Sequence, residues 1–247
     1  MIKIAIYGKG GIGKSTLCSN ISAALAKKGV KVMQIGCDPK SDSTVLLNAG
    51  EKLPSIMKKY TEKGSALELK DIVFQGENGV LCCETGGPPP GTGCAGRGII
   101  NSLERLEKLN AYGIYKPDIV IFDVLGDVVC GGFSMPMRKG YAQKVYVVTS
   151  SEKMSRYACG NISMAVENFK GRDYAELGGY ILNKKTSPED NKALEGLCKD
   201  FNTQIIGEVE YDPLIKEAEE KDTTVIKTFP ESKVALSFMN IAEKIYV

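Results

Sequence analysis

The glycine-rich segment Gly8–Ser15, with the sequence GKGGIGKS, constrains this chain more than any other feature. It fits the pattern G-x-x-x-x-G-K-[ST], follows an apolar run at Ile2–Tyr7 and precedes a helical pattern at Ser15–Lys28. Between a strand and a helix, such a loop turns its backbone N–H groups toward phosphate oxygens, and the helix N-terminus adds partial positive charge. We therefore expect a nucleotide site in which Lys14 reaches the β- and γ-phosphates and Ser15 coordinates Mg²⁺.

Apolar runs typical of strands alternate with amphipathic helical patterns along the whole chain. This alternation predicts an α/β fold, a P-loop NTPase with a doubly wound, mostly parallel sheet flanked by helices. No linker, repeat or low-complexity tract divides the sequence, so we expect a single domain over residues 1–247. The expected strands are Ile2–Tyr7, Lys31–Ile35, Asp118–Phe122, Lys144–Thr149, Leu177–Leu182 and Gln204–Gly207, and the expected helices are Ser15–Lys28, Ile99–Lys108, Lys153–Phe169, Pro188–Phe201 and Glu231–Ile245.

The charge composition argues against two classes of partner. Lys and Arg number 32 and Asp and Glu number 30, a net charge of +2, which is too balanced to indicate nucleic acid or an anionic membrane surface. The first strand leads directly into the phosphate loop, and no apolar run is long enough to cross a bilayer. We therefore expect no signal peptide, no membrane span and a cytoplasmic location.

The chain contains eight cysteines and no histidine. Without imidazole, acid–base catalysis by histidine and His-ligated zinc sites are excluded. Disulfides are rare in the cytosol, where thiols tend to be buried, catalytic or metal-bound. A transition metal in this chain would therefore have to be held by sulfur.

Two acidic segments follow later strands, at the sheet edge where ligands of open α/β folds collect. Asp38 and Asp42 come after the second strand, and Asp123 and Asp127 come after the apolar run Ile119–Phe122. A carboxylate that ends an apolar strand is the usual position for holding the Mg²⁺ shell, and both segments resemble switches ordered by a γ-phosphate. The alternative for any one of these aspartates is a helix cap.

Two cysteines, Cys94 and Cys130, are flanked by glycines and other small residues. Small neighbours allow close backbone approach and N–H donation to inorganic sulfide, which stabilises iron–sulfur clusters. Two thiols per chain cannot supply the four that a 4Fe–4S cubane needs, but two identical chains can. The alternative is simple burial, as we expect for Cys18, Cys159 and Cys198; burial is also the favoured reading for Cys37, Cys82 and Cys83.

Read together, these residues resemble the nitrogenase iron protein family, which includes the ATP-dependent reductases of dark chlorophyll synthesis and of the nickel tetrapyrrole of methanogens. The strings GKGGIGKST, GCDPK, GCAGRG and DVLGDVVCGGF occur in this order. Partitioning ATPases share the first string but not the last two. The resemblance implies an ATP-hydrolysing electron donor that is a homodimer. One 4Fe–4S cluster per dimer would be held by Cys94 and Cys130 of both copies. The partners would be a nitrogenase-like catalytic component and a low-potential donor such as ferredoxin or flavodoxin.

The resemblance also implies roles for single residues. Lys9, which follows the first glycine, would reach the nucleotide of the opposite subunit; its alternative is a solvated loop lysine. Asp38 would assist hydrolysis, and Asp127 would link the second switch to the cluster. Arg97 would lie on the docking face, where some relatives are ADP-ribosylated. The implied contacts with ATP or Mg²⁺ are Gly8, Gly10, Gly11, Ile12, Gly13, Lys14, Ser15, Thr16, Lys40, Asp42, Asp123 and, near the adenine base, Asn183.

Three departures favour a nitrogenase-like paralogue. The sequence ends at Val247 without the family's C-terminal extension, the segment Leu46–Ala66 looks shorter and divergent, and Tyr211-Asp212-Pro213 stands where a more basic motif is expected. Two other functions share the phosphate loop. One is a non-redox positioning or partitioning ATPase, and the other is a carrier that transfers clusters to other proteins.

Overall fold

The computed structural model describes residues 1–247 except 89–94, 127–131, 139, 172–173, 184–191 and 247, and at 95 and 192–193 it describes the backbone alone. Within these residues, eight strands form one sheet in the order β3-β4-β2-β5-β1-β6-β7-β8. All neighbouring strands run parallel except β3 and β4, which are antiparallel. The strands are β1 (Ile2–Tyr7), β2 (Val32–Cys37), β3 (Phe74–Gln75), β4 (Leu81–Glu84), β5 (Ile119–Val124), β6 (Lys144–Thr149), β7 (Glu176–Asn183) and β8 (Ile205–Val209).

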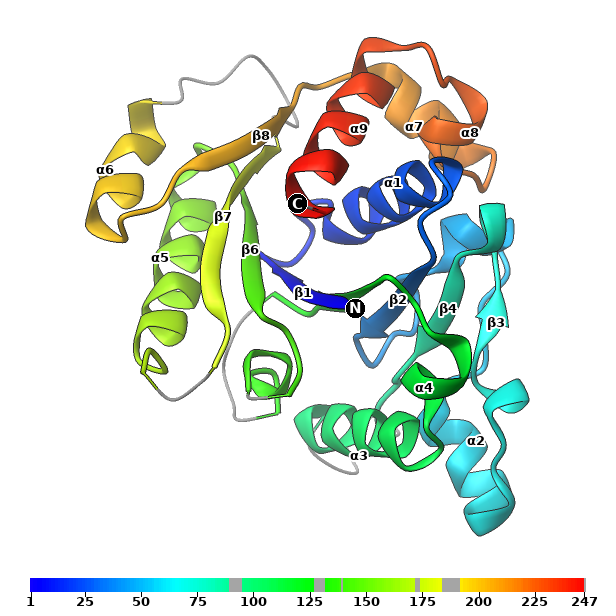
Figure 1. The fold of residues 1–247 in the computed structure, drawn as a ribbon. Helices are drawn as coiled ribbons and strands as arrows, with labels where there is room; N and C mark the ends of the chain where they lie inside the picture. Colours follow the sequence, from blue (N-terminus) through cyan, green and yellow to red (C-terminus); the bar gives the residue numbers. More distant parts are fainter. Residues whose placement is uncertain (89–94, 127–131, 139, 172–173, 184–191, 247) are drawn as a thin grey trace.

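Helices cover both faces of this sheet (Figure 1). The α-helices are α1 (Lys14–Lys27), α2 (Ile56–Lys63), α3 (Ala95–Lys108), α4 (Ala111–Tyr115), α5 (Lys153–Glu167), α6 (Lys192–Asp200), α7 (Pro213–Glu220), α8 (Val225–Thr228) and α9 (Lys233–Tyr246). Short 3-10 turns are η1 (Val45–Asn48), η2 (Gly64–Ala66), η3 (Leu69–Asp71), η4 (Glu77–Gly79) and η5 (Met135–Met137). No helix in the described part of the chain has the length and apolarity needed to cross a membrane.

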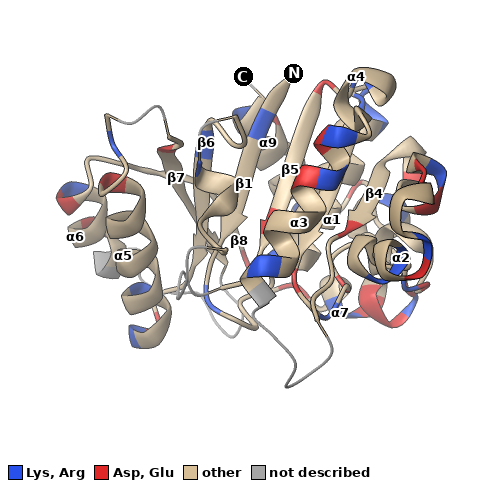
Figure 2. Ribbon diagram, turned by 90° about the horizontal axis from the view of Figure 1, so that it is seen from below, with Lys and Arg blue, Asp and Glu red and all other residues tan. Residues whose placement is uncertain are grey.

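The central strands are apolar on both sides because each side meets a different core. Along β1, Ile4 and Ile6 point into the core beneath α1 and α9, whereas Ala5 and Tyr7 point into the core beneath α3 and α5. This explains why the strand reads as an unbroken apolar run and not as an alternating one. Figure 2 shows the complementary pattern, with charged residues gathered on the outer helices and the strands largely tan.

The predicted fold class is confirmed, and the six predicted strands lie within two residues of β1, β2, β5, β6, β7 and β8. The short strands β3 and β4 and the helices α2, α4, α7 and α8 were not predicted. The predicted helix Pro188–Phe201 corresponds to α6, and its first residues lie outside the described part of the chain. A single domain over 1–247 stays a prediction.

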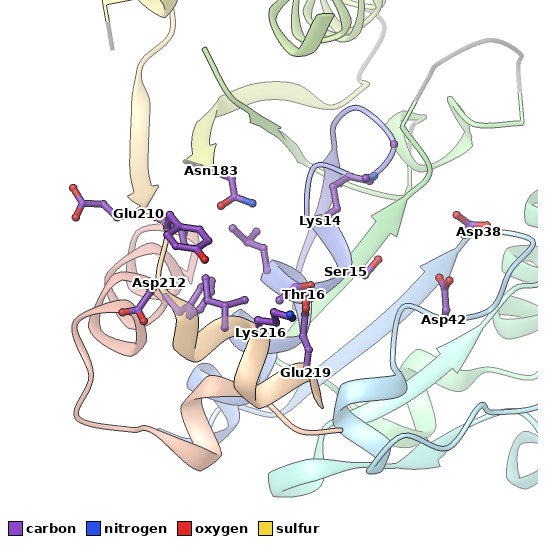
Figure 3. Close-up of a pocket in the computed structure, with 18 of the residues that line it drawn as sticks. Lys14, Ser15, Thr16, Asp38, Asp42, Asn183, Glu210, Asp212, Lys216 and Glu219 are labelled. Atoms are coloured by element: carbon purple, nitrogen blue, oxygen red, sulfur yellow. Dashed lines mark hydrogen bonds between the residues drawn. The ribbon is translucent and has the colours of Figure 1, made fainter. Parts of the chain in front are cut away.

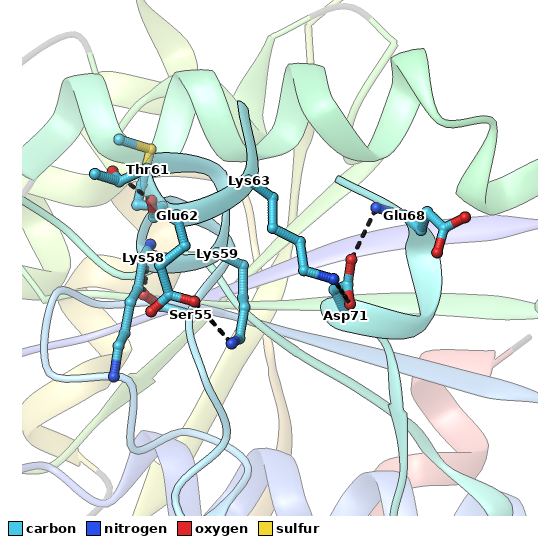
Figure 4. Close-up of polar contacts among 9 residues, drawn as sticks. Ser55, Lys58, Lys59, Thr61, Glu62, Lys63, Glu68 and Asp71 are labelled. Carbon is cyan, nitrogen blue, oxygen red and sulfur yellow. Dashed lines mark hydrogen bonds and ion pairs between the residues drawn. The ribbon is translucent and has the colours of Figure 1, made fainter. Parts of the chain in front are cut away.

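The divergent segment after the second strand forms η1, α2 and η2. On its surface, Lys59 pairs with Glu62 at 2.8 Å and Lys63 with Asp71 at 2.5 Å (Figure 4). Solvent screens ion pairs near the surface, so they add little to stability. The segment also contacts α3, where the guanidinium of Arg105 lies 3.8 Å from the centre of the Tyr60 ring.

Candidate functional site

A cavity of about 500 Å³ lies at the carboxyl edge of the sheet. Parallel strands bring their carboxyl ends to one edge, so the loops after β1, β2, β5, β7 and β8 meet there. Figure 3 shows Asp38 and Asp42 on one side of the Lys14–Thr16 segment, with Asn183, Glu210 and Asp212 on the other. The lining residues are Gly10, Gly11, Gly13, Lys14, Ser15, Thr16, Leu17, Asp38, Lys40, Asp42, Leu125, Asn183, Val209, Glu210, Tyr211, Asp212, Ile215, Lys216, Glu219 and Phe238.

The loop between β1 and α1 is held by backbone contacts that only glycine permits. Gly8 has φ 150°, and a Cβ there would overlap the carbonyl oxygen of Val148 on β6. Gly13, the residue before α1, has φ 95° and leaves the helix N-terminus without a side-chain cap. The first N–H groups of α1 are therefore available to an anion in the cavity.

Lys14 is the first residue of α1 and is only 7% exposed, yet it lines the cavity. A buried ammonium group is costly unless an anion faces it. Together with the helix N-terminus, this places two sources of positive potential at one end of the cavity. That end suits the phosphates of a nucleotide.

Asp38, Lys40 and Asp42 line the same end from the loop that follows β2. Partial burial raises the pKa of the Asp38 carboxyl, although the backbone N–H of Lys40, which donates to Asp38 Oδ1 at 2.8 Å, acts in the opposite direction. Ser41 adopts φ 51°, an uncommon conformation outside glycine. The loop thus turns sharply between two carboxylates that face the phosphate end.

Four residues expected at the nucleotide do not line the cavity. Gly8 and Ile12 belong to the phosphate loop but do not face the cavity. The carbonyl oxygen of Ile12 accepts a hydrogen bond from Asn183 Nδ2 at 2.6 Å. Lys9 is half-buried outside the cavity of its own chain. Asp123, 4% exposed at the end of β5, lies beside Cys18, whose pKa is raised by burial and by the neighbouring carboxylate.

The opposite end of the cavity was not predicted from the sequence. It is built by Val209–Asp212, by the α7 residues Ile215, Lys216 and Glu219, and by Phe238. Asp212 caps α7 by accepting from the N–H of Leu214 at 2.9 Å. The hydroxyl of Thr16 donates to Glu219 Oε1 at 2.6 Å, which joins α7 to the phosphate loop. The signal that could have found this wall is its position directly after the last parallel strand.

Cys94, Cys130 and Asp127 lie outside the described residues, so their predicted roles stay predictions. Their described neighbours are in close contact. A Cβ on Gly132 would overlap the backbone of Gly96, and a Cβ on Gly98 would lie 3.3 Å from the carbonyl oxygen of Gly86. In the sequence, Gly96 and Gly132 each follow one of the two cysteines by two positions. Arg97, which follows Gly96, is exposed on the first turn of α3, and its docking role stays a prediction.

Five of the six described cysteines are buried, as predicted, and Cys198 on α6 is the exception because it is only half-buried. Burial raises the pKa of the thiols at Cys37 and Cys83 and that of Cys82 to about 12. Buried thiols of raised pKa are poor nucleophiles and poor metal ligands. No group of three or more metal-binding side chains occurs among the residues that the structure describes.

Comparison with known proteins gives a consistent picture. The model of the family described as "4Fe-4S iron sulfur cluster binding proteins, NifH/frxC family" matches residues 2–247. The nitrogenase iron protein of Methanospirillum hungatei is 48% identical over 99% of this chain and 88% of that protein, and the one from Methanococcus voltae is 44% identical over 100% and 88%. Among solved structures, the cell division ATPase MinD of Pyrococcus furiosus superposes with a TM-score of 0.76 at 20% identity, covering 99% of this chain and 98% of that one. The last likeness supports the fold alone.

Proposed function

Because the chain belongs to the NifH/frxC family of 4Fe-4S cluster binding proteins, we propose that it is the ATP-dependent electron donor of a nitrogenase or nitrogenase-like enzyme. Two copies would share one 4Fe–4S cluster and deliver electrons to a separate catalytic component. The nucleotide cavity alone suits a positioning ATPase equally well. The observation that carries the redox proposal is the backbone contact between Gly96 and Gly132.

That contact fits a shared cluster for a steric reason. Each glycine lies two positions after a cysteine, and neither has a side chain that would separate the two segments. Cys94 and Cys130 would supply two thiolates from each copy, four in total, which is the set that a cubane requires. When bound, the cluster supplies a one-electron redox couple. The chain would bring its two thiolates together and surround them with small residues that admit backbone N–H donors.

The nucleotide end of the cavity has the groups needed for phosphate binding and hydrolysis. Lys14 and the N-terminus of α1 would hold the β- and γ-phosphates, and Ser15 with Asp42 and Asp123 would hold Mg²⁺ and its water shell. Asp38 would orient the attacking water. Lys9, which does not line its own cavity, would extend to the nucleotide of the second copy.

Coupling between the nucleotide and the cluster would pass along the segment that follows β5. Leu125 lines the cavity, and a Cβ on Gly126 would lie 2.7 Å from both Gly8 O and Gly10 N in the phosphate loop. The next residue is Asp127, and Cys130 lies three positions further on. A change in the phosphate loop therefore has a short route to a cluster ligand, provided that nucleotide binding favours one geometry of this segment over another.

Asn183 would favour adenine at the other end of the cavity. One N–H of its Nδ2 donates to the carbonyl of Ile12, which orients the carboxamide and its acceptor Oδ1. Adenine presents an amino donor at position 6, whereas guanine presents a carbonyl oxygen there. An acceptor at Oδ1 matches the amino group of adenine, so we expect ATP to be preferred over GTP.

Anaerobic purification followed by iron analysis tests the redox proposal. The wild-type dimer should contain about four irons and lose visible absorbance when dithionite is added. Cys94→Ser and Cys130→Ser should each remove the iron and leave ATP binding intact. Cys198→Ser, which changes a half-buried thiol outside the proposed ligand set, should retain it. Colourless wild-type protein that binds ATP would point to the positioning ATPase, and iron retained in both ligand variants would show that other residues hold the cluster.

A further inference from the structure

Residues Ser43 and Thr44 are fixed by three different elements of the fold. The carbonyl oxygen of Ser43 accepts from the hydroxyl of Ser19 on α1 at 3.1 Å and from Gln34 Nε2 on β2 at 3.0 Å. Glu84, the last residue of β4, accepts at Oε1 from both the backbone N–H of Thr44 at 2.8 Å and its hydroxyl at 2.6 Å. All five side chains are buried. This group of residues, here called the clamp, anchors the loop directly after Asp42.

Glu84 is the unusual member of the clamp because it is a carboxyl group that is 1% exposed. Burial raises the pKa of Glu84 to about 8, and the nearby carboxylates of Asp123 and Asp42 act in the same direction. Its second oxygen, Oε2, has no hydrogen-bond partner among the described residues. A buried carboxyl oxygen without such a partner costs stability.

The backbone around Glu84 is shaped to admit it. Gly36 of β2 pairs with Glu84 across the sheet, and a Cβ at Gly36 would overlap both Glu84 Oε2 and the side chain of Ser43. The carboxyl group of Glu84 therefore occupies space that is open only because residue 36 is glycine. Because Gly36 is followed by Cys37 and Asp38, the same strand end also carries the first of the two nucleotide-facing carboxylates.

The clamp directly follows Asp42, one of the carboxylates that line the nucleotide cavity. Asp42 is joined to Ser43, whose carbonyl is held from α1 and β2, and the next residue, Thr44, is held from β4. On the other side of Asp42, Ser41 has the uncommon φ of 51° and Asp38 is only partly buried. The loop is thus anchored at its Thr44 end and turns sharply upstream of Asp42.

We propose that Glu84 is a positioning residue for Asp42: by holding both donors of Thr44, it places the Asp42 carboxylate for the Mg²⁺ of a bound nucleotide. This inference rests on the proposed nucleotide site and adds to it a residue that touches neither nucleotide nor metal. It gives a role to a buried acid of which one oxygen has no partner among the described residues, since a shorter or apolar side chain would release Thr44.

The test compares nucleotide affinity with and without Mg²⁺. Binding of a non-hydrolysable ATP analogue is measured by calorimetry in excess Mg²⁺ and in EDTA, for wild type, Glu84→Leu and Glu84→Gln. In Glu84→Leu, the gain in affinity that Mg²⁺ provides should fall about tenfold, the usual scale for losing hydrogen bonds that hold a charged ligand in place. Affinity in EDTA should stay within about twofold, because Lys14 and the helix N-terminus are unchanged. Glu84→Gln, which keeps an acceptor oxygen for Thr44, should recover most of the Mg²⁺ effect.

Glu77→Gln is the matched control, because Glu77 Oε1 also accepts from a threonine hydroxyl, that of Thr224, at 2.9 Å but away from the cavity. It should leave the Mg²⁺ effect unchanged. If Glu84→Leu does not fold, Thr44→Val is judged by the same criterion. If the variant loses affinity for the analogue equally with and without Mg²⁺, or folds and keeps the full Mg²⁺ effect, the role of Glu84 is overturned and the nucleotide site is not. A wild-type protein that fails to bind the analogue would overturn the nucleotide site itself.

Discussion

The buried carboxyl of Glu84 makes a quantitative prediction about stability and pH. The pKa of this group rises from 4.5 in the unfolded chain to about 8 in the folded one, chiefly because burial penalises the charged form. Between these values the unfolded chain releases a proton that the folded chain keeps. Stability from this group is therefore complete below pH 4.5 and is lost as the pH rises toward 8.

The magnitude follows from the linkage relation. Each pH unit within this window costs about 1.4 kcal/mol, so Glu84 should lower the free energy of unfolding by about 3 kcal/mol between pH 5 and pH 7. In Glu84→Gln the carboxamide cannot ionise and still accepts from Thr44. The difference in unfolding free energy between this variant and wild type should therefore grow in favour of the variant by about the same amount.

Guanidinium unfolding of nucleotide-free protein at pH 5, 6 and 7, at one fixed protein concentration, measures this difference. Glu62→Gln serves as the control, because Glu62 is an exposed carboxylate whose pKa is lowered by Lys59. Its curve should run nearly parallel to that of wild type. Parallel curves for wild type and Glu84→Gln would refute the reasoning, because they would mean that the carboxyl ionises normally in the folded protein.

Two further predictions concern the cavity. Asn183→Ala should reduce the preference for ATP over GTP about tenfold in calorimetric titrations, because the oriented acceptor is lost, while Asn161→Ala on the exposed face of α5 should not. Gly8→Ala should lower the free energy of unfolding by about 1–3 kcal/mol and weaken nucleotide binding. The reason is that the φ of 150° and the overlap of a Cβ with Val148 force the phosphate loop to shift. A variant with wild-type stability and wild-type nucleotide affinity would contradict the packing of this loop against β6.

The parts of the fold that were predictable are those where one physical requirement dominates the sequence. A central parallel strand is buried on both faces, so Ile2–Tyr7 and Ile119–Val124 are unbroken apolar runs. The phosphate loop needs glycine at fixed positions, so it is visible without a structure. The strand β4 was missed because it is four residues long and ends in a glutamate, and the choice of an acid there depends on Thr44, forty positions away.

The end of the cavity opposite Lys14 was not predicted, for a related reason. Glu210, Asp212, Lys216 and Glu219 are charged residues after the last strand, and charged runs usually mark a solvated surface. Only the return of α7 against the phosphate loop, through the contact between Thr16 and Glu219, makes them part of a cavity wall. Cys198 illustrates the opposite error, since its apolar character suggested burial although it lies near the edge of the packed face of α6.

The order of the strands has a consequence for where motion can occur. The phosphate loop and both acidic segments leave the sheet from β1, β2 and β5, which are immediate neighbours in the ladder order β2-β5-β1. Their hydrogen-bonded register is continuous from Val32 to Cys37 and from Ile119 to Val124, and both faces are covered. Because these three strands are fully paired and covered on both faces, we expect a structural response to nucleotide to occur in the residues beyond their ends. Spectroscopic labels that are meant to report this response should be placed after Cys37 or Val124. A label within β1, β2 or β5 should not move and would serve as the reference.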